Sequence, residues 1–424
     1  MAAGTPAPGR SKVAAVTTVW RKDSHADVII PKLMVGYDLN GAPAASPVEV
    51  VSLYVDQYPE NDLSRRWSAR TGVPLFESVA AALTCGGTSL AVDAVLIVGE
   101  HGEYPWNENG QHLYPRRELF EQAAAVIRAS GQSPAGPGGR PVPIFNDKHL
   151  SYSWESATWM YETARALGSP LMAGSSLPVT YRVPELELAP ETDVREALVL
   201  SHGPTESYGF HALETLQCVV EYRRGGERGV ASVEHLHGDA FWEAWRAGRF
   251  PRDLYEAALA TTEHQGVSLE EFFASREPRR GAVPGPQPPL AFLVTYRDGL
   301  QATLLNLSGY VTDFTLAVRA GSGDRSNVQA TAFKLQRYPP RWHFNLLAHH
   351  VGQFFATGRA PYAVERTLLT TGTLAALMEA GHQGRRLETP HLSIAYQAPA
   401  APWLRANGDS LPPEQVWGFT PDDV

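Results

Sequence analysis

Cysteine is scarce in this chain, since only Cys85 and Cys218 occur among its 424 residues. Two cysteines exclude a disulfide framework and a structural cysteine-rich zinc site. Long hydrophobic runs are also absent, because stretches such as Ala94–Val98 and Leu290–Val294 fall far short of the about 20 residues that cross a bilayer. Positive charge is in deficit, and the net charge of -9 argues against binding to nucleic-acid phosphates. We therefore expect neither a membrane nor a nucleic acid as a partner.

The first residues lack the features of a targeting signal. Met1–Arg10 is small, polar and Pro-rich, with no apolar core behind a charged start. We expect residues 1–11 to form a flexible N-terminus and the protein to be cytoplasmic.

Length and hydrophobic content predict a folded protein of two domains. The chain is 43% hydrophobic, and single cores stop growing at about 250 to 300 residues. Over residues 12–183, continuous apolar runs alternate with amphipathic stretches, which is typical of a parallel sheet covered on both faces. The predicted strands are Lys12–Val19, Val48–Val55, Ala94–Val98 and Val142–Phe145, and the predicted helices are Ala26–Met34, Asp62–Thr71, Arg116–Ser130 and Ser153–Leu167. The fold class is α/β, beginning with a Rossmann-like doubly wound parallel sheet.

The second half of the chain changes character. Leu290–Tyr296 and Leu300–Leu307 flank Asp298-Gly299, and an Asp-Gly pair between two strand-like runs predicts a hairpin. We expect an α+β domain with a large antiparallel sheet. Because open antiparallel sheets commonly pair with a second copy, we also expect a homo-oligomer. The predicted division is a flexible N-terminus (1–11), a Rossmann-like domain (12–183), an α+β substrate or oligomerisation domain (184–395) and a C-terminal tail (396–424).

Three short segments resemble one known family. Asn109-Gly-Gln-His112 leads into a predicted helix, Asn146-Asp-Lys148 directly follows a predicted strand, and Gly209-Phe-His211-Ala-Leu-Glu214 lies in the second half. They are similar to the Asn-x-x-His turn, the Glu-Lys-Pro motif and the Gly-x-His-x-x-Asp motif of the Gfo/Idh/MocA family of dehydrogenases. The resemblance implies an oxidoreductase that uses NAD or NADP on a sugar-like or hydroxylated small molecule. It also implies that Lys148, His211, Glu214 and His112 are catalytic residues.

The residues themselves leave the roles of Lys148, His211 and Glu214 open. In a doubly wound sheet the ligand crevice lies at the carboxyl ends of the strands, where Lys148 is expected. A lysine there donates a proton if burial lowers its pKa, and the alternative is a surface lysine paired with Asp147. His211 and Glu214 share a helix face, and the alternative for His211 is a hydrogen-bonded core histidine.

The first turn departs from the family because it lacks glycine. Glycine lets the backbone approach a pyrophosphate at the helix N-terminus, whereas this turn reads Thr17-Thr-Val-Trp-Arg-Lys-Asp-Ser-His-Ala26. The cofactor-binding candidates are Thr17, Trp20, Arg21 and Asp56. Trp20 occupies space that a dinucleotide needs, whereas Arg21 offers a charge to a phosphate. Asp56 lies where a ribose-binding carboxylate belongs, although Asp after a strand is also a common turn residue. We expect nicotinamide binding to be absent or weak.

Imidazoles and carboxylates are concentrated after the predicted strands. His101, Glu103, His202 and His211 are candidate ligands for a divalent transition metal such as Zn, Mn or Fe(II). Their spacing matches no known metal motif, and the alternative is a polar, sugar-like pocket lined by hydrogen-bonding residues. Trp106, in the same loop region, offers such a ligand a flat apolar face.

Three classes of function remain open. The first is the Gfo/Idh/MocA-like oxidoreductase, in which Lys148 and His211 move the hydroxyl proton. The second is a lyase, isomerase or hydrolase that has kept the fold without the dinucleotide and uses a metal or acid and base groups. The third is a non-catalytic binding protein. Fold-level analogy does not choose among them.

Overall fold

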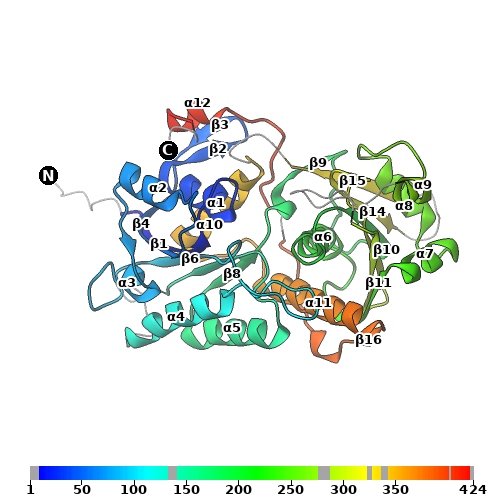
Figure 1. Cartoon of the computed structure of the whole chain (residues 1–424), viewed down its shortest axis with the longest axis horizontal. Helices are drawn as coiled ribbons and strands as arrows, with labels where there is room; N and C mark the ends of the chain where they lie inside the picture. The colour runs from blue at the N-terminus through cyan, green and yellow to red at the C-terminus, as the bar shows by residue number, and fades with distance from the viewer. Residues whose placement is uncertain are drawn as a thin grey trace.

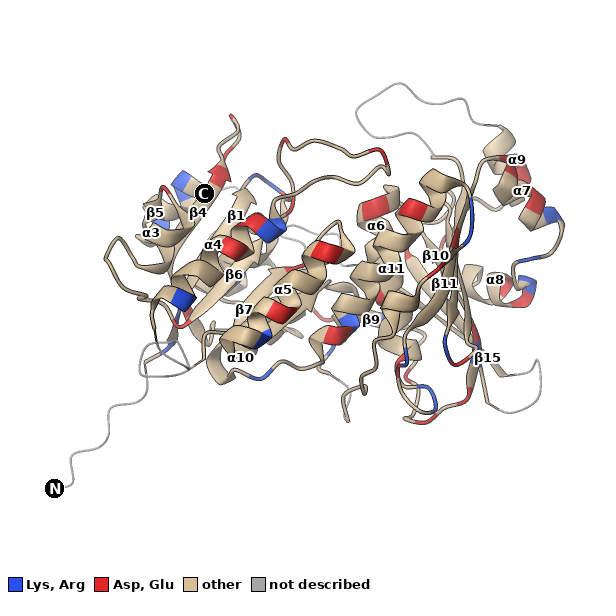
Figure 2. Ribbon diagram, turned by 90° about the horizontal axis from the view of Figure 1, so that it is seen from below, with Lys and Arg blue, Asp and Glu red and all other residues tan. Residues whose placement is uncertain are grey.

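The computed structural model describes residues 9–131, 141–275, 287–321, 327–335, 342–400 and 403–420. Residues 1–8 of the expected flexible N-terminus lie outside this description. Two sheets lie side by side, and helices α6 (Thr205–Val220) and α11 (Val364–Gln383) stand between them (Figure 1, Figure 2). No helix in the described ranges is long and apolar enough to cross a membrane.

The first sheet confirms the predicted doubly wound architecture. Its order is β5-β4-β1-β6-β7-β8, and every neighbouring pair is parallel. Its strands are β1 (Ser11–Val19), β4 (Val48–Gln57), β5 (Leu75–Phe76), β6 (Ala94–Val98), β7 (Ile144–Asp147) and β8 (Leu171–Gly174). Helices α3 (Val79–Leu83), α4 (Arg116–Ala129) and α5 (Trp154–Leu167) cover one face, and α1 (His25–Val35) and α2 (Ser64–Thr71) belong to the other. A small hairpin of β2 (Tyr37–Leu39) and β3 (Ala42–Ala44) follows α1.

The second sheet has eight strands in the order β16-β11-β12-β13-β10-β14-β15-β9. Its strands are β9 (Tyr181–Val183), β10 (Val194–Ser201), β11 (Val230–His237), β12 (Leu290–Tyr296), β13 (Gln301–Asn306), β14 (Phe314–Ala320), β15 (Val328–Lys334) and β16 (Leu387–Glu388). The predicted hairpin joins β12 to β13, with Gly299 at φ +95. The sheet is antiparallel except for the pair β10 and β13, which is parallel. That pair is no hairpin, because the chain from α6 to β12 separates its two strands.

Helices pack on both faces of the second sheet. Helices α6 and α11 cover the face turned toward the first domain. Helices α7 (Asp239–Arg246), α8 (Arg252–Leu259) and α9 (Leu269–Ala274) pack on the far face (Figure 1). That face is therefore partly covered by the chain itself, so the open sheet that motivated the expected homo-oligomer is only partly open.

The end of the chain returns to the first domain. Helix α10 (Asn345–Thr357) packs against α1 and adds Val351, Phe354 and Phe355 to the core of the first sheet. Helix α12 (Pro413–Trp417) then contacts β2 and β3. The division of the chain at residues 183 and 395 stays a prediction, but one helix from inside the expected second domain completes the core of the first.

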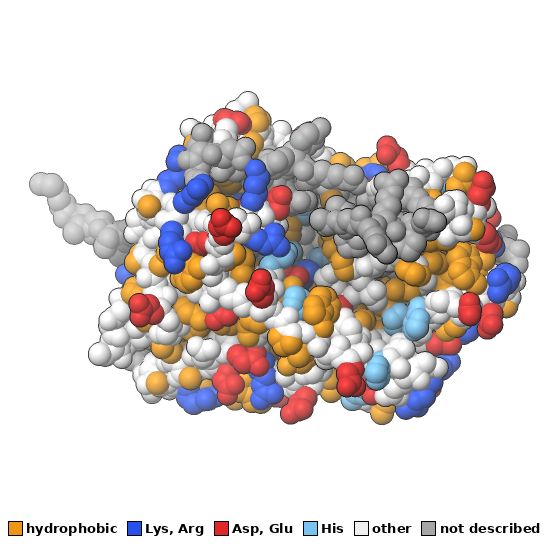
Figure 3. Space-filling view, in the orientation of Figure 1, with side chains coloured by type: hydrophobic (Ala, Val, Ile, Leu, Met, Phe, Trp, Pro, Cys, Tyr) orange, Lys and Arg blue, Asp and Glu red, His pale blue; other side chains and the backbone are white. Residues whose placement is uncertain are grey.

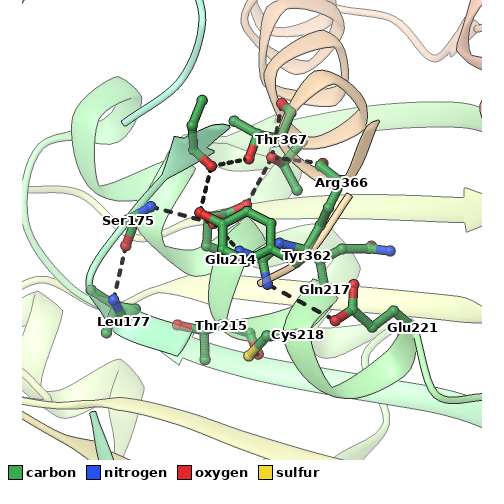
Figure 4. A network of polar contacts seen from close by, with 12 residues as sticks. Ser175, Leu177, Glu214, Thr215, Gln217, Cys218, Glu221, Tyr362, Arg366 and Thr367 are labelled. Atoms are coloured by element: carbon green, nitrogen blue, oxygen red, sulfur yellow. Dashed lines mark hydrogen bonds and ion pairs between the residues drawn. The ribbon is translucent and has the colours of Figure 1, made fainter. Parts of the chain in front are cut away.

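Buried hydrogen bonds join the two halves at the end of β8. The Tyr362 hydroxyl and the Thr367 hydroxyl both donate to the Ala173 carbonyl, each at 2.6 Å (Figure 4). Thr367 belongs to α11, so this helix is bonded to the first sheet while it packs on the second. The carboxyl edge of the first sheet is thereby held next to α6 and α11.

Trp20 lies in the core of the first domain and not in a ligand site. Its side chain is fully buried, stacks on Trp67 with ring centroids 6.0 Å apart, and donates its indole N–H to Asp27 at 3.3 Å. The expectation that Trp20 occupies the space of a dinucleotide is wrong, because the turn folds inward, buries the indole and keeps it out of the cavity lining.

Replacing Trp20 with alanine should lower the free energy of unfolding by about 3 to 5 kcal/mol, because it leaves a large cavity in a packed core. Urea unfolding should show a lower midpoint at an unchanged slope. Trp106→Ala is the matched control, since the Trp106 side chain is 62% exposed. A Trp20→Ala variant as stable as the control would contradict the core assignment.

Candidate active site

A cavity of about 1070 Å³ lies between the two domains at the carboxyl ends of the parallel strands. Figure 3 shows histidine side chains at the surface between the two halves of the molecule. The imidazoles that line the cavity belong to His25, His101, His112, His202, His211 and His343. Such rings offer donors and acceptors to a hydroxylated ligand.

Lys148 confirms the expectation that the residue after β7 enters the crevice. It is 2% exposed and lines the cavity, and its N–H donates to the Gly174 carbonyl at 3.0 Å. Its Nζ donates to Glu100 Oε1 at 2.8 Å, so the partner is Glu100 and not Asp147. The alternative of a surface lysine does not describe this geometry.

Three residues around the cavity hold a backbone conformation that L-residues rarely adopt. Asp23, His101 and Lys148 have φ values of 62, 70 and 63. All three line the cavity. Such strain persists where the surrounding structure enforces it, and it is common at functional sites.

Glu100 connects Lys148 to a second cation. Its other oxygen accepts a hydrogen bond from Arg116, which is fully buried. Burial raises the pKa of the Glu100 carboxyl, but the charges of Lys148 and Arg116 outweigh burial and hold the pKa well below its usual value. Glu100 therefore stays ionised and fixes the position of the Lys148 amine.

A second carboxylate, Glu206 on α6, faces the same network. His149 Nε2 lies 3.2 Å from Arg116 Nη1 and 3.5 Å from Glu206 Oε1. The pKa of His149 is lowered by burial and by the charge of Arg116. Arg116 and His149 carry no signal in the sequence, because neither belongs to a motif.

His211 faces the cavity from α6, as the resemblance implies. Its Nδ1 lies 2.9 Å from the Ser175 hydroxyl, which itself accepts from the N–H of Leu177. Burial lowers the pKa of His211 well below its ordinary value, and Lys148 and His25 lower it further. His211 is therefore neutral, and its ring acts as a hydrogen-bonding group and not as a fixed charge.

Glu214 shares the helix with His211 but lies behind the cavity. It is fully buried, and its oxygens accept from Ser175 N at 3.4 Å, Arg366 Nη2 at 3.4 Å and Thr370 Oγ1 at 3.0 Å (Figure 4). Glu214 is absent from the cavity lining. Its contacts place it in the junction between α6, α11 and the end of β8.

His112 lines the cavity but is held by its own loop. Its Nε2 lies 2.9 Å from the Tyr104 carbonyl, and its backbone N–H donates to Glu206 at 3.3 Å. Its ring stacks on Trp106 with centroids 4.3 Å apart. The pair presents the exposed indole at the mouth of the cavity.

The structure does not bring the four candidate metal ligands into one coordination sphere. Within the described ranges, no group of three or more His, Cys, Asp or Glu side chains could hold a metal ion. His101, His202 and His211 line the cavity, whereas Glu103 does not. Glu103 instead pairs through its backbone N–H and carbonyl with the Gln57 amide, at 2.9 and 3.1 Å.

Several hydrogen-bond donors of the first turn are engaged within the turn. The N–H of Arg21 donates to the Ser24 hydroxyl at 3.1 Å, and the N–H of Asp23 donates to the Asp27 carboxylate at 3.0 Å. Thr17 is bonded to the Val98 carbonyl at 3.0 Å, within the sheet. A pyrophosphate site needs open N–H donors and no nearby negative charge, and Asp27 supplies such a charge at the N-terminus of α1.

Asp56 is also engaged. Its two oxygens accept from the Tyr54 and Tyr104 hydroxyls at 2.9 and 2.7 Å. Tyr104 comes from the loop after β6, which Gln57 also binds, so this loop folds against the end of β4. Of the cofactor-binding candidates, only Arg21 lines the cavity. The residues of this turn do not fit a dinucleotide.

The architecture is the two-domain fold of the Gfo/Idh/MocA-type oxidoreductases, as the short motifs implied. In all, 228 chains of solved structures match it. GenD2 from gentamicin A biosynthesis, in complex with NAD, is 13% identical over 92% of this chain and 99% of that chain, with a TM-score of 0.52. Scyllo-inositol dehydrogenase from Lactobacillus casei, with NAD(H) and scyllo-inositol bound, is 11% identical over 90% and 99%, at 0.50.

A regulatory protein shares the same fold. A super-repressor mutant of Gal80p from Saccharomyces cerevisiae is 11% identical over 92% of this chain and 100% of that chain, with a TM-score of 0.50. No protein-family model matches the sequence, and no curated protein sequence matches it. At these identities the likeness establishes the fold alone.

We expect calorimetric titration with NADH and with NADPH to show no micromolar binding, because the turn has no glycine, uses the N–H groups of Arg21 and Asp23 internally and carries Asp27. A dehydrogenase with a glycine-rich turn, titrated under the same conditions, is the positive control. Micromolar affinity for either nucleotide would contradict this expectation and would restore Arg21 as a phosphate ligand.

Buried histidines make the stability of the fold depend on pH. Burial lowers the pKa of His101 to about 3 and the pKa values of His235 and His350 to about 4. In the unfolded chain these rings titrate near 6.5, so below that pH the unfolded state binds more protons. Burial of Glu221 acts in the opposite direction, since it raises that pKa to about 7.

The free energy of unfolding should therefore fall as pH drops from about 7 to about 5, by about 1.4 kcal/mol per pH unit for each net proton. Urea unfolding at several pH values measures the slope. His101→Gln should make it shallower, because one ring that stays neutral only in the folded state is gone. A slope that His101→Gln leaves unchanged would contradict the assignment.

Proposed function

We propose that this protein is an enzyme that acts on a hydroxylated, sugar-like small molecule by proton transfer, with Lys148 and His211 as its central groups. The observation that carries the proposal is that these residues, from two domains, line one cavity. Lys148 is fixed by Glu100, and His211 is fixed by Ser175.

The cavity chemistry supports a polyol or sugar as the ligand class. Imidazoles and carboxylates both line the cavity, so hydroxyl groups find both donors and acceptors. Trp106 adds an exposed apolar face that suits the C–H surface of a sugar ring. Both features recognise an uncharged ligand with many hydroxyl groups.

The closed first turn favours a reaction without a dinucleotide. An isomerase or a lyase needs an acid and a base, but its overall reaction needs no external oxidant. Lys148 and His211 supply a cation and a neutral hydrogen-bond donor for an oxygen on which charge develops. A metal-dependent isomerase or lyase is less favoured, because the candidate metal ligands do not form one coordination sphere in the described ranges.

The second candidate is a nicotinamide-dependent oxidoreductase of the Gfo/Idh/MocA type. The fold and the positions of Lys148 and His211 favour it, because the scyllo-inositol dehydrogenase of this fold holds NAD(H) together with scyllo-inositol. The nucleotide titration described above separates the two candidates. A non-catalytic binding role, suggested by the repressor that shares the fold, predicts ligand binding without turnover.

Lys148→Ala should reduce turnover by about 10²- to 10⁴-fold, the usual contribution of a proton-transferring group. Candidate substrates are found by ligand-observed NMR with aldoses, ketoses and inositols, and their conversion is followed by NMR. Lys148→Arg is the matched control, because arginine keeps the ion pair with Glu100 but does not release its proton. Equal losses in both variants support proton transfer.

Near-normal turnover in Lys148→Arg would show that the residue acts only as a cation. Normal turnover in both variants would remove Lys148 from the site. The folded state of each variant is checked by its urea midpoint, because removing the amine leaves Glu100 with Arg116 as its remaining cationic partner.

A further inference from the structure

A histidine and a buried carboxylate form a pair that no sequence motif predicted. His25 is the first residue of α1, and Asp147 is the last residue of β7. His25 Nδ1 lies 2.6 Å from Asp147 Oδ2, and the side chains are 12% and 1% exposed. This is a short, largely buried contact between an imidazole and a carboxyl group.

The Asp147 carboxylate is hydrogen-bonded to the His25 ring alone among the described side chains. In the described part of the chain, Asp147 Oδ1 has no hydrogen-bond partner, so the side-chain hydrogen bond of Asp147 goes to His25. A carboxylate only accepts, and Nδ1 of the ring therefore carries the proton. The Nε2 atom is then left with a lone pair, and the carboxylate stabilises the ring when Nε2 takes up a proton.

The ring is placed where it can act. His25 lines the same cavity as Lys148 and His211. The centroid of its ring lies 5.4 Å from that of His101 and 5.2 Å from that of Phe344. Asp147 and Lys148 are consecutive, so one strand end orients His25 and also delivers the lysine. Besides burial, the charges of Lys148 and His25 both act on the pKa of His211, which places all three within electrostatic reach.

We infer that His25, oriented by Asp147, is the general base of this site, and that it removes a proton from the carbon next to the carbonyl of a hydroxy aldehyde or ketone. This rests on the proposed function, in which Lys148 and His211 serve the oxygen. The C–H bond breaks and its proton goes to Nε2. Its electron pair forms the C=C bond of an enediol, and the carbonyl oxygen takes a proton from the Lys148 ammonium.

Return of the proton from Nε2 to the neighbouring carbon completes an isomerisation, while the other hydroxyl of the enediol gives its proton to the Lys148 amine and becomes the new carbonyl. No electron leaves the substrate, so the step needs no oxidant, in keeping with the closed first turn. This role of His25 also explains the sequence of the first turn. Ser24 and Asp27 accept hydrogen bonds from its backbone, and the start of α1 presents the His25 imidazole to the cavity.

The test is wash-in of solvent deuterium into carbonyl sugars, with D-glucose, D-fructose, D-xylose and D-xylulose as probes in D₂O. The wild-type protein should exchange the hydrogen next to the carbonyl of at least one probe, as read by ¹H NMR. His25→Asn and Asp147→Asn should each slow the exchange by about 10²- to 10⁴-fold. His349→Asn, which lies on α10 outside the cavity lining, is the control and should exchange at the wild-type rate.

The outcomes separate this inference from the proposed function. Exchange that Lys148→Ala abolishes but His25→Asn preserves would overturn the role of His25 and leave the proposed function standing. No exchange in the wild-type protein would overturn proton removal from carbon, while turnover in the substrate screen would still decide the role of Lys148.

A second measurement tests the orientation of the ring directly. ¹⁵N NMR of the histidine side chains, assigned by the signal that His25→Asn removes, should show His25 with its proton on Nδ1. A proton on Nε2 at neutral pH would overturn the inference, because Nε2 would then have no lone pair with which to take the substrate proton.

Discussion

The hydrogen bonds around the last residues of β8 hold the two domains and the site in one arrangement. The Ala173 carbonyl accepts hydrogen bonds from two hydroxyl groups, one just before α11 and one on it, and the Gly174 carbonyl accepts the N–H of Lys148. The Ser175 hydroxyl is hydrogen-bonded to the His211 ring. These contacts are buried, and buried hydrogen bonds in a low dielectric are costly to break. Because the strand belongs to one domain and the helices pack on the other sheet, this junction determines how the lysine faces the histidine.

Much of the fold followed from local patterns. The five residues of β6 are all buried, as a continuous apolar run predicts, and Asp298-Gly299 forms the turn of a hairpin. The parallel pairing of β10 with β13 was not predictable, since it joins strands about 100 positions apart through a long crossover. The packing partner of α10 was equally unpredictable. The apolar face of this helix indicates that the helix is buried, but it does not indicate which sheet the helix packs against.

The site was only partly predictable for a similar reason. Lys148 and His211 stood out because each lies in a short motif, the first of them at a strand end. His25 and Asp147 are 122 positions apart, and neither has a neighbour in sequence that reveals the contact. Glu214 shows the converse. Its helical spacing from His211 was correct, but only His211 reaches the cavity, whereas Glu214 lies in the junction with α11.

The return of α10 to the first sheet also affects how the protein is made. During synthesis the first domain emerges early, yet one side of its sheet lacks the apolar residues of α10 until the chain has grown past Thr357. Domains commonly fold in order as they leave the ribosome, but here the first to emerge waits for most of the second. The apolar surface near α1 is exposed in that interval, so the nascent chain passes through a stage in which aggregation competes with folding.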